Sequence, residues 1–357
     1  MESVLRLQIL LATAFGGICG STLNHRCLAG SEAFACILPM FDYQPGEDIP
    51  VFHIPENVSV IRFVDPLYNV HETDNVIQVY DLVLHRQLNS PRAIELCDTY
   101  TTAVEIPPDL EYAEFSYDSI ELLHVPEHPP SALRYLDLNG NYHLHPANIS
   151  RLVNLETLHL SSCSLETLPA GLFRDLNRLA HLTLSSNNMH TVDLTVFPVS
   201  LTLLRLDGNW MTKFQLGSSV GRYPLLEDLN IEHNDLTELD MHALVAVAPK
   251  LRLFSIGGNP LKRASLSGTL DTLDKLHIAY YNMELPRDQV CDRGERRYRG
   301  ACIPESVFTL EWTDWLELLF LFLGLVALLI AVSYGGAILW ARFQARSSAT
   351  ASSDSSC

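Results

Sequence analysis

Cysteine is the residue type whose spacing in this 357-residue chain most directly predicts chemistry. Cys27 and Cys36 lie close together near one end, and Cys291 and Cys302 lie close together near the other. Pairs of this kind form disulfides in an oxidising compartment. We therefore expect the bridges Cys27–Cys36 and Cys291–Cys302, with the alternative that one of these four residues pairs with Cys97.

Histidines and enzyme signatures are the next places to look for chemistry. The sequence contains no HExxH, no P-loop and no G-x-G-x-x-G. His143 and His145 lack partner ligands for a metal ion, and so do His159 and His181, because a zinc site needs at least a third protein ligand. The sequence therefore predicts no enzyme activity, no cofactor and no metal site.

Charge and composition narrow the class of partner. The chain has a formal net charge of −18. It is 47% hydrophobic, which is enough apolar sequence to form a large core. A nucleic-acid-binding domain normally presents a basic face. This balance argues against a nucleic-acid partner and permits a basic one.

Two apolar runs frame the chain. Residues 1–20 combine an early arginine, an apolar stretch and small residues, which is the layout of a secretory signal peptide. Residues 318–340 carry no charge and are followed by Arg342 and Arg346. A helix of that length spans about 34 Å, enough for a bilayer core of about 30 Å. We expect a single-pass type I protein of the plasma membrane, with the ectodomain outside and a short cytoplasmic tail at 341–357.

The sequence between these runs repeats the template L-x-x-L-x-L-x-x-N-x-L-x-x-L. Copies start at Pro91, Tyr112, Leu133, Leu155, Leu179, Leu201, Leu226, Leu251 and Leu273, with a degenerate copy near Val58. The spacing of 21 to 25 residues suits one short strand per repeat and is too short for a pair of helices. Because one repeat cannot bury its own apolar face, stacked repeats must share a core, which predicts a solenoid.

Residues 165–176, LETLPAGLFRDL, resemble the typical extracellular leucine-rich repeat, with Pro169 and Phe173 at that family's positions. The chain is similar to extracellular leucine-rich-repeat proteins, in particular to insect leucine-rich-repeat immune proteins and small receptor-like members. The resemblance implies an α/β-type repeat solenoid, a horseshoe with a parallel concave β-sheet, to which one transmembrane helix is added. The chain departs from the secreted insect proteins by its apolar run. It departs from Toll-like receptors by a tail too short for a signalling domain.

The expected domain order follows from the repeats and the cysteines. An N-terminal cap at 21–57 precedes the repeats at 58–284, which are followed by a C-terminal cap at 285–304 and a juxtamembrane linker at 305–317. Asn57 and Asn148 stand in glycosylation sequons.

Template positions 3, 5, 7 and 8 flank the inward leucines and form the concave face, the usual binding surface of such arrays. The predicted binding residues are Glu95, Asp98, Glu114, Asp118, Asp137, His159, His181, Arg205, Asp207, Asp228 and Glu232. Acids outnumber bases in this set, so the face suits a basic or polar partner. A solvated face of an acidic protein is the alternative.

Cys163 falls at template position 9, where the other copies carry asparagine. A thiol tolerates burial and is a weak donor, so it can replace the amide. Three repeat steps of about 4.8 Å separate Cys163 from Cys97, too far for a disulfide. We expect a buried free thiol at Cys163. Cys97 is expected at exposed position 7 as a free thiol or a link to another chain, unless the register there is wrong.

These features predict a membrane-anchored extracellular recognition protein, receptor-like or co-receptor, with innate immunity as one setting. It would bind an extracellular protein or a microbial surface. The alternative is an adhesion or structural protein that acts by self-association. Ala327, Ala331 and Gly335 lie four residues apart in the apolar run, a spacing that permits close helix packing in a homodimer.

Overall fold

The computed structural model describes residues 24–28, 32–47, 49–64, 76–217, 222–280, 291–308 and 312–351. The chain divides into two compact units, Met1–Pro304 and Glu305–Cys357, which are treated separately. The expected signal peptide at 1–20 lies outside the described residues.

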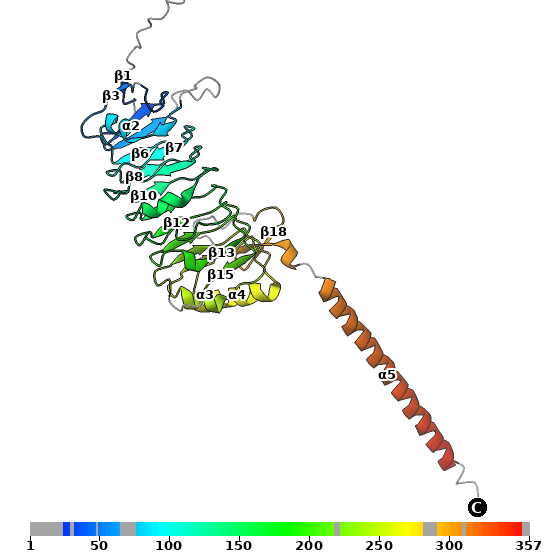
Figure 1. Ribbon diagram of the computed structural model, residues 1–357. Coiled ribbons are helices and arrows are strands. Elements are labelled where there is room, and N and C mark those ends of the chain that lie inside the picture. Colours follow the sequence, from blue (N-terminus) through cyan, green and yellow to red (C-terminus); the bar gives the residue numbers. More distant parts are fainter. Residues whose placement is uncertain are drawn as a thin grey trace, which may run out of the picture. The chain divides into compact units, whose positions relative to one another are not determined.

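The first unit is a solenoid whose main strands form one parallel ten-stranded sheet (Figure 1). Each strand of this sheet pairs with the next one along the solenoid, so the sheet grows by one strand per repeat. Its members are β2 (Ala35–Pro39), β4 (Val60–Val64), β6 (Ala93–Glu95), β8 (Tyr112–Glu114), β10 (Tyr135–Asp137), β11 (Thr157–His159), β12 (His181–Thr183), β14 (Leu203–Arg205), β16 (Asp228–Asn230) and β17 (Leu253–Ser255). The predicted repeat solenoid with a parallel sheet is confirmed.

Leucines at template positions 4 and 6 hold the repeats together. Leu136, Leu158, Leu182, Leu204 and Leu229 are the central residues of five successive strands, and each is fully buried. Burying one leucine side chain stabilises the fold by about 1.5–3 kcal/mol. Because each leucine is covered by the repeats on either side, this stabilisation belongs to the stack and not to a single repeat.

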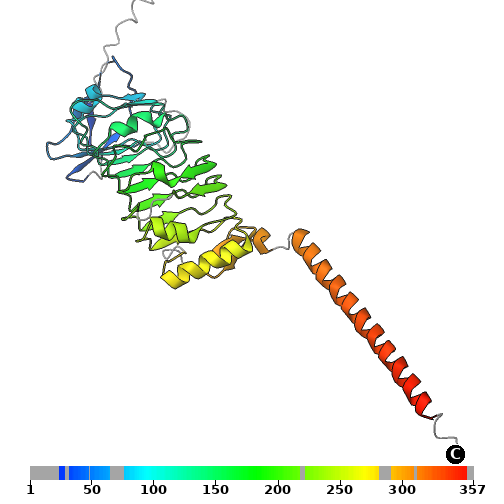
Figure 2. The same cartoon turned by 60° about the horizontal axis from the view of Figure 1, so that its bottom comes forward.

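The return side of the solenoid is built from short pieces (Figure 2). It consists of β5 (Val79–Tyr80), α2 (Leu82–Gln87), β7 (Ala103–Glu105), β9 (Leu122–His124), η1 (Pro146–Arg151), β13 (Thr191–Asp193), η2 (Leu194–Val196), β15 (Lys213–Gln215), α3 (Met241–Val247) and the longer α4 (Arg263–Leu276). The expected α/β type therefore needs correction, since the array is a β-solenoid with few helices. Prolines such as Pro107, Pro146, Pro169 and Pro198 interrupt the return segments, and each removes a backbone donor that a helix would need.

Template position 8 adopts the left-handed backbone conformation in every repeat from β6 to β17. The residues there are Asp98, Tyr117, Gly140, Ser162, Ser186, Gly208, His233 and Gly258, with φ between 51° and 76°. This turn fixes the register of each repeat. It shows that the repeat containing β8 starts at Leu110, two residues before the predicted start at Tyr112. The copy expected at Leu273 is the end of α4, and Ala279 instead forms a parallel bridge with Leu253.

Both ends of the solenoid carry the predicted disulfides. Cys27–Cys36 has its sulfur atoms 2.05 Å apart and ties the N-terminal segment to β2, so the sheet already begins inside the segment expected to be the cap. β1 (Asn24–Arg26) pairs with β3 (Val51–His53) at this end. Cys291–Cys302, at 2.04 Å, closes the loop that leads into the hairpin of β18 (Glu295–Tyr298) and β19 (Ala301–Pro304). The alternative pairing with Cys97 is excluded, because Cys97 is a free thiol.

The second unit contains η3 (Glu305–Phe308) and the long helix α5 (Trp312–Ala351). The apolar run 318–340 lies within α5. Among the residues that the structure describes, no helix combines the length and hydropathy needed to cross a bilayer. The predicted membrane span is therefore not confirmed.

Candidate binding face of the parallel sheet

The face of the ten-stranded sheet that points away from the core is called the open face here, and positions 3, 5 and 7 form it. Most of the predicted binding residues lie on it. Glu95, Glu114, Asp137, His159 and Arg205 occupy position 5, His181 and Asp228 position 3, and Asp207 and Glu232 position 7. Asp98 lies at position 8, in the turn at the edge of this face.

Position 5 places three carboxylates side by side. The strand register aligns Glu95 with Glu114 and Glu114 with Asp137 on consecutive strands. Neighbouring strands lie about 4.8 Å apart, and like charges directly opposite each other are destabilising. The row is bounded by Arg62 on β4 and by His159 on β11. The open face therefore carries a local excess of negative charge that a bound cation would relieve.

A pair of tyrosines lies beside this row at position 3. The rings of Tyr112 and Tyr135 stack with centroids 4.1 Å apart and planes 6° from parallel. The His159 ring lies next to them, 5.4 Å from the Tyr135 ring between centroids. Both tyrosines are half-buried, so part of each remains accessible to a ligand. An aromatic surface edged by carboxylates suits the aliphatic stem and charged head of lysine or arginine.

The three carboxylates differ in the hydrogen bonds and ion pairs that they form within the protein. Glu95 forms an ion pair with Arg62. Asp137 is almost buried and accepts hydrogen bonds from Asn139, at 2.8 Å from its backbone nitrogen and 3.2 Å from its side-chain nitrogen, and burial raises its pKa. The hydrogen bonds of the Glu114 carboxylate to other described residues are long.

The Cys97 thiol lies 3.4 Å from a carboxylate oxygen of Glu114, and the hydroxyl of Ser116 lies 3.5 Å from the same oxygen. Burial raises the pKa of Cys97 to about 11, so the thiol stays protonated near pH 7. Cys97 is therefore a protonated donor on the open face, at the position 7 that the sequence predicted. Glu114 is the carboxylate of the row most available to a ligand.

The two histidines of the face each meet a threonine on the neighbouring strand. His159 Nδ1 lies 2.6 Å from Thr183 Oγ1, and His181 Nδ1 lies 3.5 Å from Thr157 Oγ1. Burial lowers the pKa of His159, which keeps its ring neutral near pH 7. The open face does not bring the histidines together as metal ligands. Among the described residues, the one cluster of potential ligands includes Cys291 and Cys302, whose sulfurs are already joined in the disulfide.

The C-terminal part of the open face is a mixed polar surface. Asp207 accepts a hydrogen bond of 2.8 Å from the Ser185 hydroxyl. Burial raises the pKa of both Asp228 and Glu232, and the positive charge of Arg205 opposes this for Asp228. Arg205 is the one base beside these three acids in the described part of the sheet, and the negative charge of Asp207 raises the pKa of Glu232 further. This part is therefore also acidic, but it lacks the stacked tyrosines of the β6–β10 segment.

Asp118 is the predicted binding residue that lies in the interior of the repeats, away from the open face. The corrected register puts it at position 9, where it is 5% exposed and accepts hydrogen bonds from the preceding repeat. The misplacement follows from reading Tyr112 as position 1. The true inward residues of β8 and its turn are Ala113 and Phe115, and a buried alanine does not show in a leucine pattern.

Cys163 does stand in for asparagine, as predicted. It is buried and unpaired, and its thiol donates to the Leu138 carbonyl oxygen at 3.2 Å. Asn187, one repeat further, donates to the equivalent carbonyl of Leu160 at 2.8 Å. The thiol therefore keeps the donor half of the amide function.

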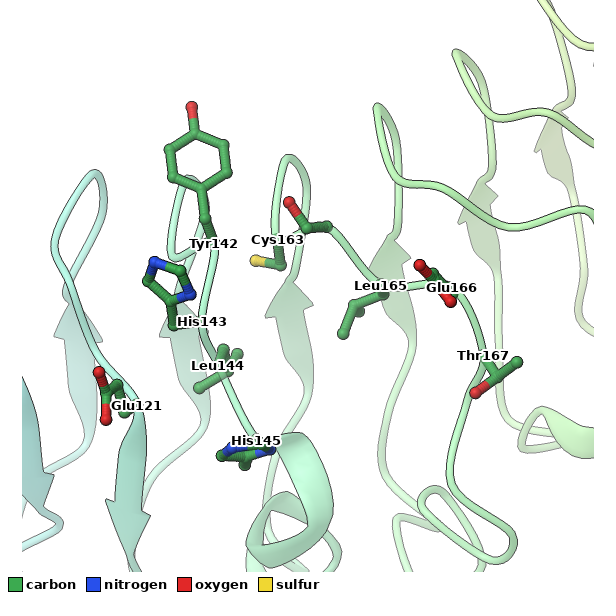
Figure 3. Close-up of a pocket in the computed structure, with 10 residues that line it drawn as sticks. Glu121, Tyr142, His143, Leu144, His145, Cys163, Leu165, Glu166 and Thr167 are labelled. Atoms are coloured by element: carbon green, nitrogen blue, oxygen red, sulfur yellow. The ribbon is translucent and has the colours of Figure 1, made fainter.

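A hollow of about 430 Å³ lies on the flank of the array, beside the turns that leave the sheet (Figure 3). Three successive repeats build it, with Glu121 from one, Tyr142, His143 and His145 from the next, and Glu166 from the third. Figure 3 shows the Tyr142 ring extending away from the ribbon and the His143 ring near Glu121. No sequence motif predicts this hollow, because its residues come from equivalent loops of different repeats.

One enzyme-like pattern lies directly after β15. Residues 217–221 read GSSVG and satisfy the G-x-S-x-G pattern of serine hydrolases. That pattern is informative only in a sharp turn between a strand and a helix. Gly217 follows β15, but residues 218–221 lie outside the described residues and the next helix is α3 at Met241. In the described part of the chain, no helix follows β15 closely enough to supply the strand–turn–helix context of a nucleophile.

Comparison with known proteins agrees with the repeat architecture. Residues 153–211 match a family described as leucine rich repeat. The chain is 31% identical over 194 residues to Toll-like receptor 9 of Mus musculus, which covers 46% of this chain and 19% of that receptor. It is 27% identical over 244 residues to Tsukushi of Gallus gallus, covering 62% of this chain and 64% of Tsukushi. The chain thus spans only part of the length of these relatives.

Solved structures with a similar arrangement include the leucine-rich repeat domain of APL1B, at 16% identity and a TM-score of 0.45, covering 70% of this chain and 72% of that one. The TLR13–ssRNA13 complex is a second, at 19% identity and a TM-score of 0.47, covering 57% of this chain and 29% of that one. At this level the likeness concerns the repeat architecture alone.

Proposed function

We propose that this leucine-rich-repeat protein, related in sequence to Toll-like receptors and Tsukushi, is an extracellular recognition protein whose open face binds a cationic segment of a protein ligand. The observation that carries the proposal is the cross-strand row Glu95, Glu114 and Asp137 beside the stacked Tyr112 and Tyr135. Innate immunity is one setting for this role, suggested by the match to Toll-like receptor 9.

The physical basis of recognition is the relief of repulsion. Three adjacent carboxylates persist in the folded protein because the leucine core fixes the strands behind them. An arginine or lysine side chain that enters the row gains attraction from the carboxylates and contact with the tyrosine rings. The acids in this row come from three different strands, which suits an extended basic segment lying across the sheet.

The proposal includes a membrane anchor at residues 318–340. Three arguments support it: the run has no charged residue, α5 continues through it, and its large apolar side chains such as Phe320, Leu321 and Val332 are exposed. Exposed apolar surface of this extent normally needs a partner or a lipid phase. In the proposed topology the repeats lie outside the cell and Cys357 lies inside.

A binding experiment tests the recognition proposal. Full-length protein in detergent micelles is immobilised and exposed to an arginine-rich peptide, to a glutamate-rich peptide of equal length and to single-stranded RNA. We expect the arginine-rich peptide to bind and to weaken as salt rises, because exposed charges are screened. Preferential binding of the RNA would overturn the proposal and the expected absence of a nucleic-acid partner.

Variants locate the binding. Glu114→Gln and Tyr135→Ala should weaken binding of the arginine-rich peptide. Glu166→Gln removes an exposed acid from the flank and is the matched control, expected to leave binding unchanged. Equal loss in Glu114→Gln and Glu166→Gln, with binding unchanged in Tyr135→Ala, would mean that net charge alone attracts the peptide, and the open face would then not be its site.

Fractionation and labelling test the anchor separately. In a Cys97→Ser background we expect the chain to stay in the membrane pellet after alkaline carbonate extraction. A membrane-impermeant maleimide should label Cys357 only after cells are permeabilised. Release into the supernatant would remove the anchor from the proposal and leave the recognition role standing.

Self-association is a second candidate function, favoured by exposed tyrosines on the flank. Tyr100, Tyr117 and Tyr142 come from three consecutive repeats and are all exposed. Adjacent exposed rings are typical anchors of protein–protein contacts. Sedimentation analysis of the full-length protein and of a Tyr117→Ala/Tyr142→Ala variant tests this role. An oligomer that disappears in the variant while peptide binding persists would support adhesion by the flank.

A further inference from the structure

Position 9 of the repeats forms a column of buried side chains behind the open face. Five of its members are asparagines, namely Asn141, Asn187, Asn209, Asn234 and Asn259. Asn187 illustrates their bonding. Its amide oxygen accepts from the backbone N–H groups of Cys163 and Leu165 in the preceding repeat, both at 3.0 Å. Its amide nitrogen donates to the position-6 carbonyls of the preceding repeat and of its own, Leu160 at 2.8 Å and Leu184 at 3.0 Å.

Asp118 occupies the same column and reproduces the accepting half of this arrangement. Its Oδ1 accepts from the backbone nitrogens of Thr99 at 2.7 Å and Thr101 at 3.4 Å, which hold positions 9 and 11 of the preceding repeat. The Thr99 hydroxyl donates to the same oxygen at 2.9 Å. Oδ1 therefore does what the asparagine oxygen does elsewhere.

The other oxygen of Asp118 is buried and has no hydrogen-bond partner among the residues that the structure describes. By the repeat register it takes the place of the amide nitrogen, which in the other repeats donates to two position-6 carbonyls, here those of Leu96 and Phe115. An ionised carboxylate can only accept hydrogen bonds, and so can a carbonyl. An ionised Asp118 thus leaves acceptors facing one another in a buried site, an arrangement that is costly.

We infer that Asp118 is a proton-binding site in the column: as a neutral carboxylic acid, its Oδ2–H donates to the position-6 carbonyls and completes the role of the missing asparagine. Burial raises the pKa of Asp118 to about 6, and the negative charge of Asp98 in the preceding repeat acts in the same direction. The hydrogen bonds from Thr99 and Thr101 act against it. The next member of the column, Asn141, is neutral.

The sign of the pH effect follows from linkage. The pKa of Asp118 is higher in the folded chain than the ordinary 3.8, so between these values the folded chain holds a proton that the unfolded chain has released. The stability that this group contributes therefore rises as pH falls through about 6 and levels off near pH 4. Between these values the unfolding equilibrium constant decreases by up to about tenfold for each pH unit. The joint concerned lies between the repeats of β6 and β8, which also carry Glu95 and Glu114 on the open face.

Thermal unfolding of the full-length protein in detergent, from pH 4.5 to pH 8, tests the inference with Asp118→Asn. The asparagine variant should melt above the natural protein at pH 8, and this advantage should shrink through pH 6 and vanish near pH 4.5. Comparing the two chains removes the contribution of other groups, such as buried His85. The pKa of His85 is lowered in the folded chain, so this residue reduces the stability of the fold in acid in both chains alike. Cys163→Asn is the matched control, because it changes the same column without a carboxyl and its effect should not depend on pH in this range.

A second measurement does not depend on stability. The infrared difference spectrum between pH 5 and pH 8 should contain the carbonyl band of a neutral carboxylic acid that is missing in Asp118→Asn. An advantage of Asp118→Asn that is equal at every pH, a variant that melts below the natural protein or fails to fold, or the same infrared band in both chains would each overturn the inference.

Discussion

The rings of Tyr112 and Tyr135 stack face to face on neighbouring strands, with centroids 4.1 Å apart. The two side chains belong to consecutive repeats. The stack therefore contributes to the packing between those repeats and also forms part of the open face. The stack lies next to the row of carboxylates at position 5. A ligand bound there can contact the aromatic rings and the negative charges together.

Removing one ring should weaken both fold and binding. We expect Tyr135→Ala to lower the free energy of unfolding by about 1–3 kcal/mol, from lost burial and about 0.5–1.5 kcal/mol of ring pairing. Tyr135→Phe keeps the ring and should stay close to the natural protein. Urea unfolding of the single variants and of Tyr112→Ala/Tyr135→Ala forms a cycle. Strict additivity of the two alanine variants would show that the stack adds nothing beyond burial.

Neutralising the middle carboxylate should stabilise the fold and reduce binding. Glu114→Gln removes the charge that faces Glu95 on one side and Asp137 on the other, so we expect a gain of about 0.2–1 kcal/mol at low salt. In high salt the gain should shrink, because the repulsion is screened. Glu95→Gln is the control, since it breaks the ion pair with Arg62 and should not stabilise. If Glu114→Gln were destabilising, the row would not be under electrostatic strain.

The column at position 9 predicts opposite outcomes at two of its members. Asn187→Ala leaves buried backbone donors and acceptors without partners, and we expect it to cost about 3 kcal/mol. Cys163→Asn restores an oxygen acceptor that the thiol lacks and should add about 1 kcal/mol. Asn188→Ala, at the exposed neighbouring position, should change the free energy of unfolding by less than about 0.5 kcal/mol. Chemical denaturation of the three variants measures these differences.

Glycosylation should be easier to detect at Asn57 than at Asn148. Both side-chain amides donate to a backbone carbonyl, Asn57 to that of Ala33 and Asn148 to that of Leu123 at 2.7 Å, but Asn57 is exposed in the turn before β4 whereas Asn148 is half-buried in η1. On secretion from eukaryotic cells, Asn57→Gln should abolish most of the shift that a glycan-removing enzyme causes on a gel. A shift lost only in Asn148→Gln would reverse this order.

Much of the fold could be predicted from the spacing of the leucines. From Leu133 to Leu251 every predicted start coincides with the observed register, because each inward position carries a leucine or another large apolar residue. The register failed where the core uses a small residue, at Ala113, and where a strand copy was expected inside the helix that ends at Leu276. The disulfides were predictable because their cysteines are local neighbours in sequence.

The candidate site was only half visible from the sequence. Its acids at position 5 could be read from the repeats, but the stack could not, because the shifted register turned Tyr112 toward the core. Arg62, which neutralises one end of the row, lies between Ile61 and Phe63 in the degenerate copy near Val58, whose strand was expected there but whose outward residue was not among the predicted binding residues. The hollow beside Tyr142 depends on loops of three repeats coming together, which a linear pattern does not show.

The parallel bridge at Ala279 has a consequence for assembly. Phe254 donates its backbone N–H to the Ala279 oxygen at 2.7 Å, and the Ala279 N–H donates to Arg252 at 2.8 Å, so these backbone groups at the last strand of the ten-stranded sheet are occupied from within the chain. A second molecule cannot polymerise onto those groups by continuing the ladder. The open face and the flank remain open to a second copy, as do the edge strand β2 and the helix α5. A dimer formed on the open face would compete with the ligand for the same tyrosines and carboxylates, so each copy would act as an inhibitor of the other.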